Sequence, residues 1–109
     1  MPANNTTRAR HAPAHTPVLA SLVHARAIYR YSSLRYGLTP LATCLLCRLA
    51  LLDEKSMSIA LLIKGLCTGE EGGLAVKKLL ASGLAVKTGL FIGLTLSGQK
   101  AARALSAPI

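Results

Sequence analysis

Acidic residues are scarce in this chain of 109 residues. Only Asp53, Glu54, Glu70 and Glu71 oppose thirteen Lys and Arg, so the formal net charge is +9. The four carboxylates stand in two adjacent pairs, without a nucleophile motif or a phosphate-cradling loop, and this argues against an enzyme. A field of this sign attracts polyanions, so nucleic acid and anionic membrane surfaces are the first partners to consider.

Long apolar runs are also missing. The longest uncharged stretches, such as residues 41–47 and 56–63, are far shorter than the roughly 20 residues that span a bilayer. The first seventeen residues have no apolar segment of the kind found in secretory signals. We therefore expect no membrane span, no signal peptide and a cytoplasmic location.

Cysteines are few, and their number is odd. Cys44, Cys47 and Cys67 have no secretory context, so a disulfide framework is not expected. Cys44 and Cys47 have redox-motif spacing but lie in a Leu-rich helical pattern, and all three histidines are upstream of them. The favoured interpretation is buried free thiols, with a redox sensor as the alternative, and we expect no metal or other cofactor.

Apolar residues are nonetheless abundant. They make up 51% of the chain, and the mean hydropathy is +0.43. A chain of this length buries only one modest core. The excess implies that a monomer would expose apolar surface outside its core. Self-association is the simplest way to bury this surface.

Periodicity and end signals divide the chain into one basic arm and one domain. Residues 1–17 contain three prolines and no apolar period, which predicts a disordered arm, and residues 18–109 form the domain. Thr39-Pro40 and Thr68 have the positions of helix starts, and Gly83 that of a helix stop. Residues 55–58 are predicted to be no more than a strand-like link. The expected helices are about 18–36, 40–52, 59–66, 70–82 and 97–105, and the expected strands of a hairpin are about 84–87 and 90–94.

This order of elements resembles a winged helix-turn-helix, and the resemblance is most specific in three segments. Residues 77–86 read Lys-Lys-Leu-Leu-Ala-Ser-Gly-Leu-Ala-Val, residues 94–99 read Leu-Thr-Leu-Ser-Gly-Gln, and residues 38–41 read Leu-Thr-Pro-Leu. They are similar to the end of the recognition helix, the end of the second wing strand and the start of the second helix in MarR-type regulators. The similarity covers roughly residues 37–105. The expected fold class is mainly α with a small β-hairpin.

The resemblance implies a homodimer that binds duplex DNA with two-fold related half-sites. The helix at 70–82 would enter the major groove, the hairpin would be the wing, and the terminal helices would build the dimer. The basic arm could follow a neighbouring groove or act only as a solubilising tail. The expected DNA-binding residues are Glu70, Glu71, Gly73, Leu74, Lys77, Lys78, Lys87, Thr88, Arg8 and Arg10. The expected dimerisation residues are Leu19, Leu22, Val23, Tyr29 and Leu105.

The start of the expected recognition helix departs from this family. Glu70 and Glu71 suit the helix dipole but repel phosphates, although a carboxylate can also accept a hydrogen bond from cytosine. Gly72 and Gly73 each cost about 1 kcal/mol inside a helix. They indicate a helix that starts late, the favoured interpretation, or a backbone that closely approaches another group.

The tyrosines and arginines between residues 26 and 36 allow two interpretations. Tyr29, Tyr31 and Tyr36 alternate with arginines and could stack on single-stranded bases. Packing in a helix–helix dimer contact, with the hydroxyls at the rim, is favoured.

Two functions follow from these patterns. The first is a nucleoid-associated, sequence-preferring transcriptional regulator, and a repressor is favoured over an activator. The alternative is a winged-helix protein-interaction module, an anti-repressor or adaptor, because the recognition helix begins with acidic and apolar residues. Binding to a membrane surface is less favoured, since the arginines at 26–35 are spread around the predicted helix.

Overall fold

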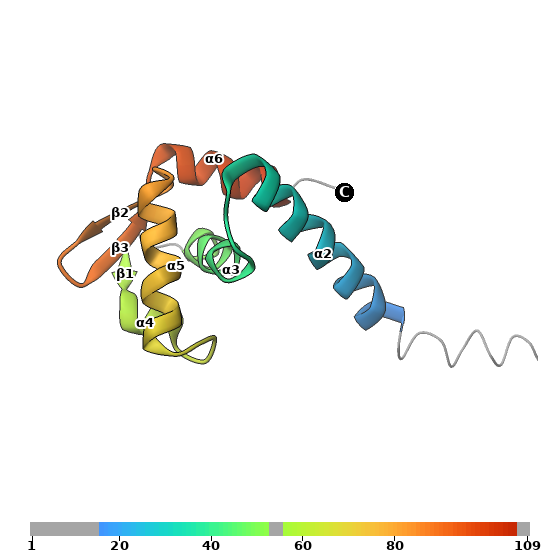
Figure 1. The fold of residues 1–109 in the computed structure, drawn as a ribbon, viewed down its shortest axis with the longest axis horizontal. Coiled ribbons are helices and arrows are strands. Elements are labelled where there is room, and N and C mark those ends of the chain that lie inside the picture. Colours follow the sequence, from blue (N-terminus) through green and yellow to red (C-terminus); the bar gives the residue numbers. More distant parts are fainter. Residues whose placement is uncertain (1–15, 53–55, 107–109) are drawn as a thin grey trace, which may run out of the picture.

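The computed structural model describes residues 16–52 and 56–106, which form five helices and a small antiparallel sheet (Figure 1). The mainly helical class with a β-hairpin is confirmed at this level. The elements are α2 (Thr16–Tyr36), α3 (Pro40–Ala50), β1 (Met57–Ser58), α4 (Ile59–Ile63), α5 (Gly69–Ala81), β2 (Ala85–Thr88), β3 (Phe91–Leu94) and α6 (Leu96–Ser106).

The sheet has three strands in the order β1-β3-β2, one more than the predicted hairpin. Met57 pairs with Ile92, so part of the predicted link at 55–58 is an edge strand. The hairpin turn is Gly89–Leu90, one residue later than expected, because Thr88 pairs with Phe91. Gly89 has φ +62° and Leu90 a negative φ, as in a type II′ turn, which favours glycine at its first central position.

Helix ends follow local backbone chemistry. α2 begins at Thr16, inside the predicted arm, since Pro17 is compatible with a first helical turn. α4 ends at Ile63 and not near residue 66, because Lys64 is extended, with ψ 126°, and Gly65 has φ +80°. Thr68 caps α5 as predicted. The predicted late start of α5 is wrong, because the helix already includes Gly69.

The end of α5 forms a Schellman motif that leads into the hairpin. Gly83, with φ +75°, donates its N–H to the carbonyl of Leu80 at 3.1 Å, and Leu84 donates to Leu79 at 3.1 Å. This confirms the predicted helix-stop glycine. The motif fixes the direction in which β2 leaves α5.

Helix α3 lies at the centre of the molecule, and α2, α4, α5, α6 and β3 pack around it (Figure 1). The side chains of the molecule's core are mostly aliphatic and come from almost every element. The fully buried large side chains are Leu38, Leu45, Leu46, Leu62, Leu79 and Ile92, together with Thr43 and Ser32.

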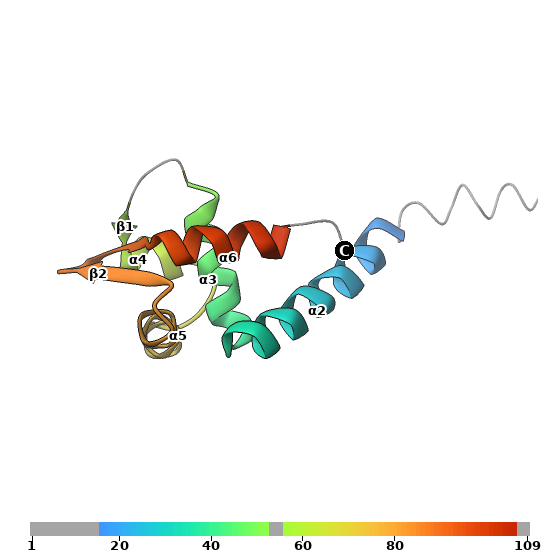
Figure 2. The same cartoon turned by 90° about the horizontal axis from the view of Figure 1, so that it is seen from above.

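The two buried hydroxyls join α2 to α3. Thr43 Oγ1 donates to the carbonyl of Thr39 at 2.9 Å, so the hydroxyl of Ser32, at 2.7 Å, is the donor to Thr43 Oγ1. Each buried polar group therefore has a partner. This contact holds the carboxyl half of α2, whereas its amino half extends away from the other described elements (Figure 2).

Candidate nucleic-acid interface

Helix α5 is fixed at its amino end by a capping box. The backbone N–H of Glu71 donates to Thr68 Oγ1 at 3.1 Å, and the backbone N–H of Thr68 donates to Glu71 Oε1 at 3.0 Å. The Thr68 hydroxyl also donates to Glu71 Oε1. Hydrogen bonds to the charged form lower the pKa of Glu71. The carboxylate of Glu71 therefore serves the helix end itself.

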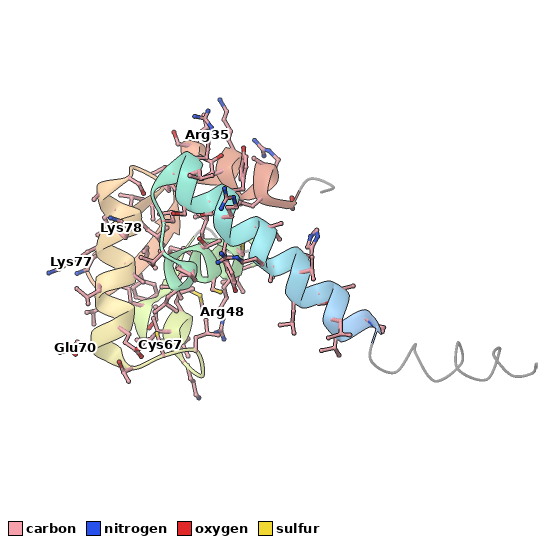
Figure 3. The ribbon with its side chains drawn as sticks, turned by 45° about the vertical axis from the view of Figure 1, so that its right-hand side comes forward. Arg35, Arg48, Cys67, Glu70, Lys77 and Lys78 are labelled. Carbon is pink, nitrogen blue, oxygen red and sulfur yellow. The ribbon has the colours of Figure 1, made fainter. Side chains whose placement is uncertain are left out.

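The outward face of α5 carries five of the ten predicted DNA-binding residues. Glu70, Leu74 and Lys77 follow one another at intervals of one helical turn, flanked by Gly73 and Lys78, and all are exposed. Leu74 is 64% exposed. Lys77 and Lys78 point away from the body of the molecule (Figure 3). This face is therefore acidic at its start, apolar in its middle and basic near its end.

The two glycines at the start of α5 differ in their surroundings. A Cβ on Gly72 would lie 2.6 Å from Cγ2 of Ile63, whereas a Cβ on Gly73 would meet nothing within 4 Å. The alternative of a close approach is thus confirmed for Gly72, which lets α5 pack tightly on α4. Gly73 leaves bare backbone on the outward face.

An arginine of α3 supports the turn between α4 and α5. Arg48 Nη1 donates to the carbonyl of Lys64 at 3.1 Å, close to the break at Gly65. This sets the position of the helix pair relative to the central helix. No sequence pattern singles out Arg48, because a lone arginine on a helix has no local signal that reveals such a partner.

The hairpin presents one cation and several apolar side chains. Lys87 and Thr88 are exposed near its tip, as is Leu90, which is 78% exposed. Val86 and Phe91 lie on the outer face of the sheet and are 55% and 52% exposed. A phosphate could be reached by Lys87, but the outer face itself is apolar.

The structure separates the predicted dimerisation residues into two groups. Leu19, Leu22 and Val23 are 60%, 63% and 72% exposed on the amino half of α2. Leu105 is only 2% exposed because it packs in the core of its own protomer. The prediction is therefore corrected: Leu105 is chiefly a core residue, and its side chain also lines a groove between α3 and α6. Arg8 and Arg10 lie outside the described residues.

Tyr29 contacts a thiol of α3 within the protomer, and both groups are half-buried. Tyr29 Oη is 3.1 Å from Cys44 Sγ, and this hydrogen bond, with burial, raises the pKa of Tyr29. Burial also raises the pKa of Cys47, which keeps that thiol protonated. Tyr31 packs edge-on against Tyr36, at 6.2 Å between ring centroids. Tyr29 is thus used mainly in the packing of α2 on α3.

The three cysteines are free, as expected, but each is only partly buried. Cys44 and Cys47 are both on α3, and Cys67 precedes α5. In residues 16–52 and 56–106 no group of three or more His, Cys, Asp or Glu is arranged to hold a metal ion.

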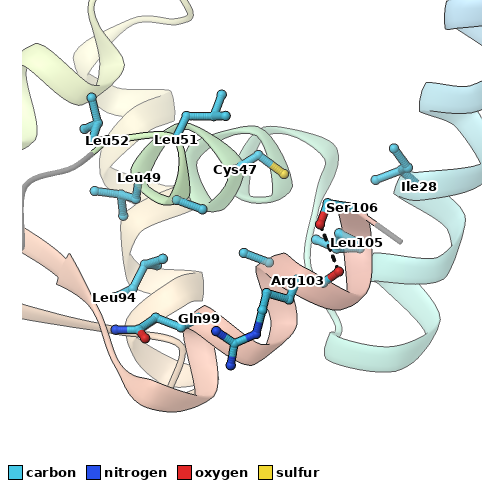
Figure 4. Close-up of a pocket in the computed structure, with 12 residues that line it drawn as sticks. Ile28, Cys47, Leu49, Leu51, Leu52, Leu94, Gln99, Arg103, Leu105 and Ser106 are labelled. Atoms are coloured by element: carbon cyan, nitrogen blue, oxygen red, sulfur yellow. Dashed lines mark hydrogen bonds between the residues drawn. The ribbon is translucent and has the colours of Figure 1, made fainter. Parts of the chain in front are cut away.

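An apolar groove of about 790 Å³ opens between the end of α3 and α6, with Ile28 of α2 at its edge (Figure 4). Its walls include Leu49, Leu51 and Leu52 on one side and Leu94 and Ala102 on the other. Leu51 is 85% exposed. No local pattern indicates this groove, because its walls come from segments more than forty residues apart.

Comparisons with models of protein families, with curated proteins and with solved structures found no match. Within the described part of the chain, no helix combines the length and the apolar character needed to cross a bilayer.

Proposed function

We propose that this protein is a homodimeric, sequence-preferring regulator that binds duplex DNA through α5, with the hairpin as a wing. The observation that carries the proposal is the outward face of α5. A capped helix follows a short helix and a turn, precedes a hairpin, and presents Lys77 and Lys78 to solvent. A repressor of transcription in the nucleoid is the form of regulator that we favour.

The charges of the described residues support this proposal. Their only side-chain carboxylates are Glu70 and Glu71, and Glu71 is used in the capping box. Every other charged side chain of these residues is a cation. Phosphate contacts supply most of the affinity of such proteins, and base contacts supply the preference for a sequence.

Residues at the start of α5 would then face the base edges. Glu70 could accept from a cytosine N4 amino group, and Leu74 could contact a thymine methyl group. Gly73, where an added Cβ would meet nothing within 4 Å, would allow the backbone to approach the groove. Lys77, Lys78, Lys87 and Thr88 would contact phosphates.

The test is fluorescence anisotropy on random duplex and on the protein's own upstream DNA over a salt series. Lys77→Ala/Lys78→Ala should weaken binding by about tenfold or more and lower the salt slope by about 1 to 2, since each phosphate contact contributes about 0.9. The matched control is Arg35→Ala/Lys100→Ala, which removes two exposed cations from α2 and α6. Equal losses in both variants would mean that only overall charge matters, and the proposal for α5 would fail.

A protein-interaction module is the second candidate, because apolar side chains are exposed on both α5 and the hairpin. Leu74 is 64% exposed on α5, and Leu90 is 78% exposed at the hairpin tip. Such side chains are typical of the centre of protein interfaces and contribute little to phosphate binding.

Glu70→Gln separates the two candidates. It removes the one carboxylate of α5 that has no capping role, and so should tighten binding to random duplex several-fold if α5 lies against DNA. If α5 binds a protein, the same substitution leaves DNA affinity unchanged, and Leu74→Asp abolishes the partner complex while Lys77→Ala/Lys78→Ala does not.

A further inference from the structure

The amino half of α2 continues a packing stripe that has no cover in the protomer. Val18, Leu22, Ala25, Tyr29, Ser32 and Tyr36 follow one another at intervals of four and three residues, the spacing by which one helix packs along another. The last three lie against the body, where Ser32 is fully buried. Val18 and Leu22 are 60% and 63% exposed. We name residues 17–25 the arm. From here on this name denotes the first half of α2 and not the basic segment predicted for residues 1–17.

The groove between α3 and α6 begins where this stripe leaves the body. Ile28 of α2 lines the edge of the groove, one turn from Ala25 at the end of the arm. The exposed apolar side chains of the arm therefore come close to the apolar walls of the groove. A second helix with an apolar face fits this surface better than an extended polar segment.

Charge favours a second copy of the arm as that helix. Although the chain carries +9, the arm has no Lys, Arg, Asp or Glu. Arg103 is the one charged residue among those that line the groove. Two basic protomers can thus approach here with the least repulsion.

The remaining segments of this chain have few apolar side chains to offer to the groove. Residues 1–15, 53–55 and 107–109 include only Met1 and Ile109 as long apolar side chains. The arm, in contrast, offers Val18, Leu19, Leu22 and Val23, all at least 60% exposed.

We propose that the arm of each protomer docks in the groove of a second copy, so that two arms are exchanged around a two-fold axis. This inference rests on the homodimer of the proposed function and assigns its surface. Each exposed aliphatic side chain leaves on the order of 100 Å² in water. Four from each arm, the groove wall that they cover, and the two-fold repeat give on the order of 1,200 Å², the lower end of the range for stable interfaces. An isologous contact of this kind closes at two copies.

Sedimentation equilibrium measures the dimer directly. Leu22→Glu should raise the dimer dissociation constant at least tenfold, because it places a charge in an apolar contact. Leu34→Glu is the matched control: the same change on the same helix, at a residue that is 76% exposed and outside the arm. It should leave the constant within twofold of the wild type. A monomeric wild type, or equal losses in both variants, would overturn the proposal.

Cross-linking then locates the arm. In a background with Cys44, Cys47 and Cys67 changed to Ser, Leu22→Cys and Leu51→Cys together should form a disulfide under mild oxidation and yield a species of dimer mass. Neither substitution alone should do so. A dimer with Leu22→Cys alone would mean that the arms pair with each other and not with the grooves. Absence of any cross-link in a dimer that forms normally would also refute docking in the groove. A helical circular dichroism spectrum confirms that each variant is folded.

Binding to random duplex, measured on the same samples, keeps the two proposals separate. A dimer that cross-links as expected but does not bind DNA would support the exchange of arms and contradict the proposed DNA-binding function. A protein that binds DNA but stays monomeric would support DNA binding and contradict the exchange of arms.

Discussion

Two helical glycines with opposite surroundings test the packing at the level of single residues. A Cβ on Gly98 would overlap the backbone carbonyl oxygen of Leu84, which cannot move without disturbing the start of β2. We expect Gly98→Ala to lower the free energy of unfolding by about 1–3 kcal/mol, as overpacking does. Gly73→Ala is the control, because its Cβ would meet no atom within 4 Å, and it should raise stability by up to about 1 kcal/mol. Urea unfolding of the two variants measures whether each substitution raises or lowers the free energy of unfolding. A loss of stability in Gly73→Ala would contradict this structure of α5.

The capping box predicts a pH dependence that comes from one carboxylate. The pKa of Glu71 is lowered in the folded state by its hydrogen bonds with Thr68. Its contribution is therefore fully present above the pKa of an unfolded Glu, about 4.3, and is lost as the pH falls through the lower folded value. Glu71→Gln keeps an acceptor for Thr68 but cannot titrate. The difference in unfolding free energy between wild type and Glu71→Gln should shrink as the pH falls from about 6 to about 3.

Glu70 supplies the control for this pH effect. It stands beside Glu71 at the exposed start of α5 but makes no hydrogen bond to Thr68. Glu70→Gln should change the pH profile less than Glu71→Gln does. Equal changes in both variants would attribute the effect to the helix dipole in general and not to the capping box.

At the scale of elements, the predicted helices and hairpin follow from local chemistry and were therefore accessible from the sequence. Thr39 with Pro40, Thr68 and Gly83 mark ends that the structure confirms. β1 was missed as a sheet strand because only two residues pair, and their partners in β3 are distant in sequence. The same holds for the groove and for the contact of Arg48 with Lys64. Such features depend on which elements contact one another in the fold, and the local spacing of apolar residues does not indicate these contacts.

The contact between α3 and the α4–α5 turn gives a prediction at this scale. Arg48→Ala removes the hydrogen bond to the carbonyl of Lys64, so we expect faster hydrogen exchange of the backbone amides in residues 64–68 and a loss of stability of about 1 kcal/mol. Because this turn positions α5, affinity for duplex DNA should fall several-fold even though Arg48 itself need not contact DNA. Arg35→Ala, an exposed arginine of α2, is the control and should leave exchange in this turn unchanged. Unchanged exchange in Arg48→Ala as well would mean that the contact is not maintained in solution.

At the scale of the molecule, the described residues expose apolar side chains in two settings: beside lysines on α5 and the hairpin, and without charged neighbours in the arm of α2. Lys77, Lys78 and Lys87 lie on α5 and the hairpin, whereas the arm of α2 carries no charged residue. The sequence revealed the excess of apolar residues. It did not show which of them lie in the core and which on the surface, since Leu22 and Leu105 have the same residue type. Only the packing of α6 against α3 shows that Leu105 belongs to the core.

This division predicts that two leucines, both expected in the dimer from sequence, respond differently to alanine. Leu105→Ala opens a cavity in the protomer core and should lower the free energy of unfolding by about 2–5 kcal/mol. Leu22→Ala removes an exposed side chain, 63% accessible in the protomer, and should act only through association. Unfolding of a dimer depends on protein concentration, by about 1.4 kcal/mol for each tenfold change. In urea titrations over a hundredfold concentration range, Leu105→Ala should lower the midpoint even at the lowest concentration, because it weakens the core of the protomer itself. Leu22→Ala should approach the wild-type midpoint at low concentration and lose the increase at high concentration, because the folded protomer is intact and only its pairing is weakened.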